Sequence, residues 1–444
     1  MASLGVVCIL SLLACASCGT DHGTPVRPPG ERAYAEATEE ARRTGPEPVE
    51  GVTEAQSSAL ASAANSFSVE LWRSLGARDG NLAVSSGSIS LALAMTWAGA
   101  RGETASQMAE KLHFDDTGGL HGAAANLLAR WNDPERDSYE LRVANRLFGD
   151  RAFAIEKEFL ALTRDRYGAG IEGLDFRGAA ERSRSRINGW VAGQTRDRIR
   201  DLLPKSSIDE GTRLVLVNAV YFLGRWQAPF ETEATSDAVF HRSGGEPTVR
   251  VPTMHRTGSH RYAETDELQV LELPYEGADF AMTLLLPRAV HGCSELEGQL
   301  SADQIARWIG ALGYEPVEVA IPRFEIDPAE PLRLAGSLRA MGMELAFDPR
   351  AADFTGIAKA SGSEDRLFIA EVFHKAFVKV DEAGTEAAAA TAVDMGPTAA
   401  APPFDEPPPP KVFRADHPFL FLIRDVRSGV ILFTGRVSDP SARS

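Results

Sequence analysis

The residue types that most often perform catalysis are present in this 444-residue chain, but their spacing matches no catalytic site that we can identify. The nine histidines are scattered, and His255 and His260, which lie close together, have no third ligand near them for a metal ion. Beyond the first twenty residues there is no G-x-S-x-G, H-E-x-x-H, P-loop or C-x-x-C motif. The sequence therefore predicts a protein that is not an enzyme and that has no metal or other cofactor.

One glycine motif resembles a dinucleotide-binding fingerprint. Gly168, Gly170 and Gly173 in RYGAGIEG have the G-x-G-x-x-G spacing. A dinucleotide site needs a strand before the glycines and a helix after them. Here the helical run EFLALTRDRY comes first and the strand-like LDF follows, so the sequence predicts a glycine turn instead.

A segment near the C-terminus has a composition that is compatible with more than one structure. Its sequence is DEAGTEAAAATAVDMGPTAAAPPFDEPPPP. Compact domains rarely keep so long a segment without obvious structure, and when they do it is usually functional or a linker. Gly384 lets the backbone swing where the segment begins. Every second residue after Gly384 is small or apolar apart from hydroxyl groups, so one face of a strand formed here would suit burial. These positions are Thr385, Ala387, Ala389, Thr391, Val393 and Met395.

The same segment also fits two simpler interpretations. TEAAAA has high helix propensity, and Thr385 could cap the N-terminus of such a helix. The segment could also be a linker, although little chain follows it to form another domain. From the residues alone, an insertable strand, a helix and a linker all stay open.

Composition and charge narrow the class of protein. Hydrophobic residues make up 44% and charged residues 24% of the chain, which is typical of a globular protein with a sizeable core. The formal net charge of −16 disfavours a nucleic-acid partner, because phosphate binding needs clustered lysines and arginines. Helical patterns come first and strands dominate the second half, so the sequence predicts one α+β domain over residues 56–440.

The N-terminus predicts export. Its apolar run is too short to span a membrane and is followed by small residues, as in a secretory signal, here residues 1–18. LLAC resembles a bacterial lipobox, which would place a lipid on Cys15, with Cys18 as the alternative; an ordinary signal peptide cut a few residues later is the other interpretation. Residues 19–55 are expected to form a disordered tether. Cys293 is expected to be a free thiol. We therefore expect a protein that is lipid-anchored to the bacterial envelope or secreted, and that meets a membrane only through the anchor.

Hydrophobic periodicity predicts the elements of the domain. Residues 56–76 fit a helix, and residues 81–114 fit a short strand followed by two helices. A helix is also expected to end just before Pro204, in AERSRSRINGWVAGQTRDRIRDLLP. RLVLVNAVYFLGRW, residues 213–226, fits a strand that is buried on both faces. Further strands are expected at 139–150, 268–276, 280–287, 317–326, 367–380, 417–425 and 429–437.

Several of these segments together resemble the serpin family. They occur in the family's order and span roughly Ser57 to Pro440, and such an ordered set is far more specific than any single match. The segments are NLAVSSGSISLALAMTWAGARGETASQMAEKL, VNAVYFLGRWQAPF, VPTMH, LPYEG, MGMELAFDPRAADFTGI, FHKAFVKVDEAGTEAAAATAV and FRADHPFLFLIRD…ILFTGRV.

The resemblance implies the serpin fold, in which N-terminal helices pack on large mixed or antiparallel sheets and a reactive-centre loop, about residues 381–412, is exposed. It implies a monomer that inhibits a serine protease through a covalent acyl-enzyme, followed by insertion of the cleaved loop into the main sheet. The alternative is a non-inhibitory serpin, a binding or structural protein such as ovalbumin. In the implied hinge of the loop lie Glu382, Gly384, Thr385, Glu386, Ala387, Ala388, Ala389 and Ala390.

The resemblance also implies roles for single residues. Counting from the hinge places the cleaved bond at Thr398-Ala399, with bonds after Met395 and Phe404 as alternatives. No lysine or arginine lies between Asp381 and Pro410, so an elastase-like or subtilisin-like protease is expected rather than a trypsin-like one. The residues that match the shutter and the breach, where the central strands part, are Ser85, Ser88, Asn218 and His374 for the shutter and Trp226 for the breach.

Overall fold

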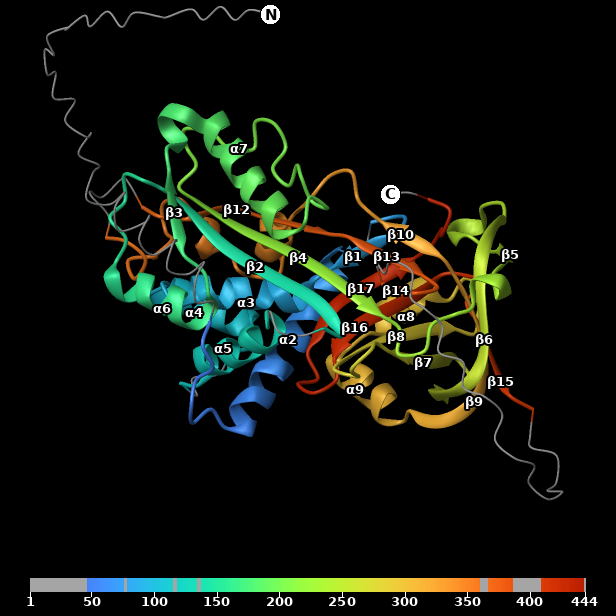
Figure 1. Cartoon of the computed structure of the whole chain (residues 1–444). Coiled ribbons are helices and arrows are strands. Elements are labelled where there is room, and N and C mark those ends of the chain that lie inside the picture. Colours follow the sequence, from blue (N-terminus) through green and yellow to red (C-terminus); the bar gives the residue numbers. More distant parts are fainter. Residues whose placement is uncertain are drawn as a thin grey trace, which may run out of the picture.

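The strands described by the structure, a computed structural model, form two large sheets (Figure 1). The structure describes residues 46–75, 78–114, 118–133, 137–359, 366–385 and 409–442. Most neighbouring strands are antiparallel, whereas β4 with β12, β2 with β3 and β9 with β15 are parallel. Helices and mixed sheets in one domain confirm the predicted α+β fold class.

One sheet has nine strands in the described part of the chain. Its order is β1-β17-β16-β8-β7-β6-β9-β15, and β5 pairs with β6 beside this path. The strands are β1 (Leu82–Val84), β5 (Ser236–Phe240), β6 (Val249–Glu264), β7 (Leu268–Pro274), β8 (Phe280–Pro287), β9 (Gly313–Pro322), β15 (Lys411–Arg414), β16 (Phe419–Asp425) and β17 (Ile431–Val437).

The other sheet, which we call the hinge sheet, has eight described strands. Its order is β10-β13-β14-β4-β12-β11, and β2 pairs with β4 on one side and with β3 on the other. The strands are β2 (Tyr139–Asp150), β3 (Ile171–Leu174), β4 (Leu214–Arg225), β10 (Phe324–Ile326), β11 (Leu332–Arg333), β12 (Ile369–Ala376), β13 (Val378–Asp381) and β14 (Gly384–Thr385).

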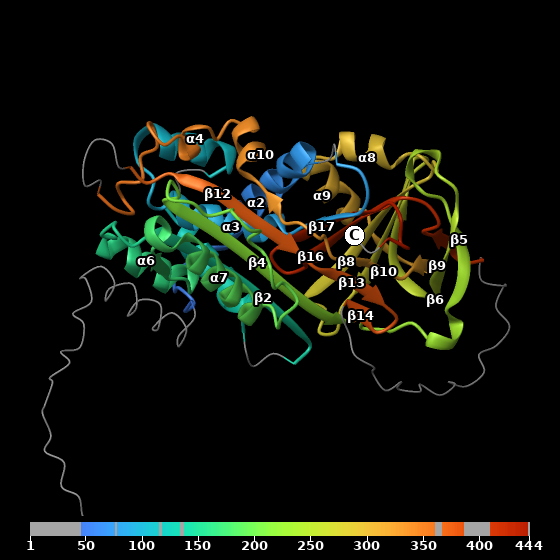
Figure 2. The same ribbon diagram turned by 90° about the horizontal axis from the view of Figure 1, so that it is seen from above.

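Helices cover both faces of the hinge sheet. α7 lies on one face of β2 and β4, whereas α3 packs on their other face and also contacts β17 of the nine-stranded sheet (Figures 1 and 2). α2 lies behind α3 and contacts α9 and α10. The described α-helices are α2 (Glu54–Leu75), α3 (Ser86–Trp97), α4 (Gly102–Lys111), α5 (Leu120–Trp131), α6 (Lys157–Tyr167), α7 (Phe176–Gln194), α8 (Cys293–Gln299), α9 (Ala302–Gly310) and α10 (Ala335–Ala340).

The long strand β4 is buried on both faces, as the sequence predicted. Leu214, Leu216 and Val220 belong to the main core between the sheets. Val215 and Val217 point the other way, into a smaller core under α7. Two cores on one strand follow from the alternation of side chains along a strand, and they hold β4 at the centre of the hinge sheet.

Several predicted boundaries differ from the structure: the strands expected at 317–326 and 367–380 are each divided in two, and two helix boundaries have a clear physical cause. α2 begins at Glu54, inside the segment expected to be a tether, because Thr53 and Gln56 form a capping box: Thr53 Oγ1 accepts from the Gln56 N–H at 3.2 Å, and Gln56 Oε1 accepts from the Thr53 N–H at 2.9 Å. The prediction that a helix reaches Pro204 is wrong. α7 ends at Gln194, because Arg196 and Asp197 have left-handed backbone conformations that a helix cannot include.

Other sequence predictions can be checked in the same part of the chain. The glycine motif is a turn: Gly168 is a left-handed cap at the end of α6, and β3 follows it. Cys293 is a buried free thiol whose pKa is raised by burial to about 12. None of the described helices has the length and apolarity needed to span a membrane.

Candidate functional site

The chain folds back on itself at the end of β13 and begins a new strand. Glu382 and Ala383 form the turn, and β14 then lies between β13 and β4. Gly384 pairs with Arg225 of β4, and Thr385 pairs with Gly224, both in antiparallel register. Two hinge residues of the predicted loop, Gly384 and Thr385, therefore already occupy a strand position in the hinge sheet.

Gly384 is required here by a close approach of two backbones. An added Cβ would lie 2.1 Å from the carbonyl oxygen of Gly224, and a backbone atom within a sheet has little freedom to move away. Gly384 also has a φ of 154°, which side-chain-bearing residues rarely adopt. Glycine at position 384 is therefore needed for close packing against Gly224, in addition to the backbone freedom that the sequence predicts for a hinge.

Glu382 anchors the turn. Its carboxylate accepts hydrogen bonds from the guanidinium of Arg323, at 2.7 Å from Nε, and from the hydroxyl of Thr235. Its carbonyl oxygen accepts from the backbone N–H of Phe230 at 2.9 Å. Burial alone would raise the pKa of Glu382, but the hydrogen bonds from Arg323 and Thr235 lower it below its usual value. The turn is therefore fixed to the segment that follows β4 by an ionised side chain.

Thr385 contacts a pair of aromatic rings at the end of β4. The residue is 1% exposed, and its hydroxyl lies 2.6 Å from the hydroxyl of Tyr275. Tyr275 stacks on Trp226, with ring centroids 4.7 Å apart. Trp226 donates its indole N–H to the Asp381 carbonyl oxygen at 3.0 Å and its backbone N–H to the Ala383 carbonyl oxygen at 2.9 Å. Trp226, which the resemblance assigns to the breach, thus holds the turn from which the loop departs.

The residues assigned to the shutter lie in one buried network further along β4. Asn218 on β4 faces His374 on β12 across the parallel strands, and Asn218 Oδ1 lies 2.7 Å from Nδ1 of His374. Nε2 of His374 accepts from the backbone N–H of Ser85 at 3.1 Å. The amide nitrogen of Asn218 donates to Ser88 Oγ and, at 2.6 Å, to Asn145 Oδ1. This chain of bonds joins β2, β4 and β12 to the start of α3.

The network fixes the protonation of His374. The backbone N–H of Ser85 can only donate, so Nε2 of His374 must be the acceptor and Nδ1 must carry the proton that is donated to Asn218. Burial lowers the pKa of His374 to about 3, so the ring is neutral at physiological pH. Both ring nitrogens of the neutral His374 are hydrogen-bonded, and we call its contact with Asn218 the clasp between β4 and β12.

Sequence reasoning missed Arg323 and Thr235, which anchor Glu382, and also Asn145 and Tyr275. Asn145 lies opposite Asn218 in the register of β2 and β4, and an asparagine in the middle of the predicted strand YELRVANRLFGD was the signal available. Tyr275 belongs to LPYEG, which was recognised as a family segment without a role for the tyrosine. His255 and His260 belong to no group of potential metal ligands among the described residues.

Several predicted residues lie outside the described residues, so the structure assigns them no position. They are Cys15, Cys18, Glu386, Ala387, Ala388, Ala389, Ala390, Met395, Thr398, Ala399 and Phe404.

Comparison with known proteins agrees with this arrangement. A family model described as Serpin (serine protease inhibitor) matches residues 62–440. The leukocyte elastase inhibitor of Equus caballus is 40% identical over 390 residues, covering 86% of this chain and 99% of that protein. The thermophilic serpin tengpin in its native state has a TM-score of 0.77 at 28% identity and covers 90% of this chain and 98% of its own. Uncleaved ovalbumin has a TM-score of 0.74 at 28% identity, over 86% of this chain and 100% of its own.

Proposed function

Because this chain belongs to the serpin family of serine protease inhibitors, we propose that it traps a serine protease as a suicide substrate. The protease attacks the loop that follows Thr385 and forms an acyl-enzyme. The freed arm then inserts between β4 and β12 as a new strand, and the tethered protease is distorted before it can complete hydrolysis. The inhibitor contributes the loop and the sheet, and no catalytic residue.

The observation that carries this proposal is the position of β14. Gly384 and Thr385 lie between β13 and β4, whereas further along the sheet β4 pairs directly with β12. A loop that continued this strand would have to part β4 from β12, and the contact between Asn218 and His374 lies on that line. This position supports the proposal, because further entry would continue β14 and would have to break the contact between Asn218 and His374.

The register of β14 also predicts how far the arm can enter. Thr385 pairs with Gly224, and each later residue of the loop would pair with one earlier residue of β4. Met395 would therefore reach Leu214, where β4 begins. Cleavage after Thr398 would leave only Gly396 to Thr398 between the strand and the protease, a short tether that favours distortion. Cleavage after Phe404 would leave a slack tether, and this argument disfavours it.

The target class follows from the loop and from the relatives. Small residues surround Thr398, and no lysine or arginine lies between Asp381 and Pro410. The relative from Equus caballus is named a leukocyte elastase inhibitor. We propose an elastase-like or subtilisin-like target. The N-terminal sequence supports export, with lipidation of Cys15 as the means of attachment to the envelope.

The direct test mixes the intact protein with pancreatic elastase, subtilisin, chymotrypsin and trypsin. We expect a band at the summed mass that survives SDS with elastase or subtilisin, together with a released C-terminal peptide that starts at Ala399. Trypsin is the internal control for target class and should form no such band by cleavage in the loop. Cleavage of the loop by every protease without a stable complex would support the non-inhibitory alternative. Ovalbumin shares the fold, so the fold alone does not separate the two functions.

A further inference from the structure

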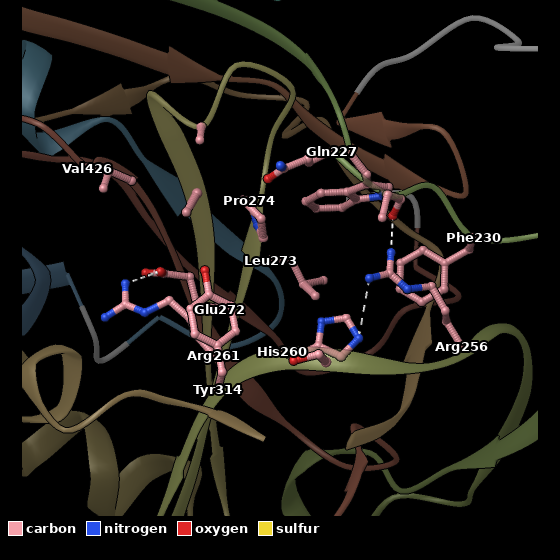
Figure 3. A pocket seen from close by; sticks show the side chains of 15 residues that line it. Gln227, Phe230, Arg256, His260, Arg261, Glu272, Leu273, Pro274, Tyr314 and Val426 are labelled. Carbon is pink, nitrogen blue, oxygen red and sulfur yellow. Dashed lines mark hydrogen bonds and ion pairs between the residues drawn. The ribbon is translucent and has the colours of Figure 1, made fainter. Parts of the chain in front are cut away.

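A pocket of about 510 Å³ opens beside the hinge turn, between β6, β7 and the segment that follows β4 (Figure 3). Its volume lies in the range of small-molecule sites. Trp226 and Phe230 line it on the side of the hinge, and Leu273 and Pro274 line it from β7. The pocket shares Trp226 and Phe230 with the hinge contacts, whereas Arg256, His260 and Leu273 take part in none of them.

Arg256 is the charged group of the pocket that lacks a counter-ion. Its guanidinium is half-buried, lies 5.7 Å from the ring centre of Phe230 and donates to the Ala228 carbonyl oxygen. Within the described parts of the chain, no carboxylate pairs with it. Burial lowers the pKa of Arg256, as expected for a cation held partly away from water.

The other charges of the pocket are already compensated. Arg261 and Arg424 both pair with the buried carboxylate of Glu272. Among the charged residues that line the pocket, Arg261 pairs with Glu272 and Arg256 has no carboxylate partner in the described structure, so the balance is positive. A positive balance in a partly buried pocket favours an anionic ligand.

His260 supplies a second donor. The residue is 3% exposed, and its Nε2 accepts from Nη2 of Arg256 at 3.4 Å. Since Nε2 is the acceptor, Nδ1 carries the proton, and this N–H has no hydrogen-bond partner in the described structure. Figure 3 shows the imidazole of His260 beside Arg256 at the pocket. This N–H has no protein partner among the described residues, so it can donate to a ligand oxygen without breaking a hydrogen bond within the protein.

The remaining walls suit a flat apolar body. Trp226, Phe230, Leu273 and Pro274 present aromatic or aliphatic surface. Tyr314 lines the same pocket from β9 and is 77% exposed, so it lies at the edge of the pocket that faces solvent. Mostly apolar walls with a few convergent polar groups are typical of sites for small organic ligands.

We propose that this pocket binds a small organic anion, an aryl carboxylate, whose carboxylate contacts the guanidinium of Arg256 and the Nδ1–H of His260. The aromatic body of the ligand packs against Trp226 and Leu273, under Tyr314. This binding function is separate from protease inhibition, because it requires neither an intact loop nor a protease.

The test uses titration calorimetry on the full, uncleaved chain with three ligands of the same size. These are 2-naphthoate, the neutral 2-naphthamide and the cationic 2-naphthylmethylammonium. We expect 2-naphthoate to bind more tightly than the other two. Arg256→Gln should weaken naphthoate about tenfold or more, since a charge-assisted hydrogen bond is lost, and should leave naphthamide nearly unchanged.

Arg250→Gln is the matched control. Arg250 lies on the same strand and donates to a backbone carbonyl oxygen, that of Asp237, but it does not line the pocket. This variant should bind naphthoate like the parent protein. Tyr314→Ala changes an exposed residue, so it should fold normally, and it should weaken both naphthoate and naphthamide because their cover is lost.

Two results would overturn the proposal. One is the absence of saturable naphthoate binding up to about 1 mM, the weak end of the affinity scale. The other is binding that Arg256→Gln and Arg250→Gln reduce equally, since that would indicate general attraction to positive charge. Melting curves of each variant exclude loss of folding as the cause.

Discussion

Replacing Thr385 with arginine should turn the inhibitor into a substrate. Thr385 is 1% exposed in the described structure and pairs with Gly224 and Val380, which offer no carboxylate to a new cation. The substitution also removes the hydroxyl that lies 2.6 Å from that of Tyr275. An arm that carries this arginine cannot settle at the start of the new strand without burying an unpaired charge.

The size of the effect can be estimated from these contacts. An unpaired hydroxyl on buried Tyr275 costs about 1–3 kcal/mol, and a guanidinium without a partner costs several kcal/mol more. A barrier to insertion that rises by about 4 kcal/mol slows insertion about a thousandfold. Hydrolysis of the acyl-enzyme is unaffected, so nearly every cleaved molecule should release an active protease.

The assay is the stoichiometry of inhibition, titrated with an elastase or subtilisin that the parent protein traps. Glu386→Arg is the matched control, because strand alternation places the next side chain on the opposite face. We expect Glu386→Arg to trap protease like the parent, and Thr385→Arg to be cleaved without forming an SDS-stable complex. Because Thr385 is already buried before cleavage, the arginine is expected to expel the hinge from the sheet, and insertion must then bury the charge. If Thr385→Arg traps protease with unchanged stoichiometry, this requirement for burial in the inserted strand is refuted.

Four further substitutions test other parts of the argument. The unfolded chain binds a proton near pH 6.5 that folded His374, with a pKa of about 3, does not bind. The contribution of this group to the free energy of unfolding is therefore complete above pH 6.5 and falls as the pH drops, by about 2 kcal/mol at pH 5. In urea unfolding at several pH values, the free energy of unfolding of His374→Gln should decrease less steeply toward acid pH than that of the parent protein. Gly384→Ala should expel the hinge from the sheet, because Cβ would meet the Gly224 carbonyl oxygen at 2.1 Å, and limited proteolysis near the hinge should become faster. Thr391→Val should lower the added heat stability of the cleaved form by about 1–3 kcal/mol, for the reason developed below, as a melting scan of cleaved protein would show. Cys15→Ser should abolish lipid labelling of the expressed protein in a bacterial host, and continued labelling would refute Cys15 as the acceptor.

Much of the fold followed from periodicity in the sequence. The predicted strand 139–150 coincides with β2, and the prediction that 213–226 is buried on both faces is confirmed by the two cores that meet at β4. The end of α7 was not predicted, because residues up to 203 keep a helical pattern of charge and apolarity. The left-handed conformations of Arg196 and Asp197, which end the helix, have no glycine or proline to mark them.

The site could be predicted as a set of residues but not as a set of contacts. Ser85, Asn218 and His374 were assigned by family resemblance, yet their spacing in the sequence gives no clue that one network joins them. The pairing of Thr385 with Gly224 could not be predicted from the sequence either. It depends on the tight turn after β13, and this turn is held by Arg323, far away in the sequence.

The register of β14 explains how the clasp between β4 and β12 could be opened without leaving buried polar groups unpaired. If the loop continues the strand that Thr385 begins, Thr391 would lie opposite Asn218, on the face that Thr385 presents to Tyr275. Insertion separates the Asn218 amide from the His374 ring and leaves one acceptor and one donor in the core. A threonine hydroxyl can donate to the first and accept from the second, which an alanine or valine cannot do. Insertion also replaces one parallel ladder by two antiparallel ones, each bond contributing about 1 kcal/mol net. On the proposed mechanism, the clasp would oppose entry of the strand at first, and the entering strand would itself bring the hydroxyl group that satisfies Asn218 and His374.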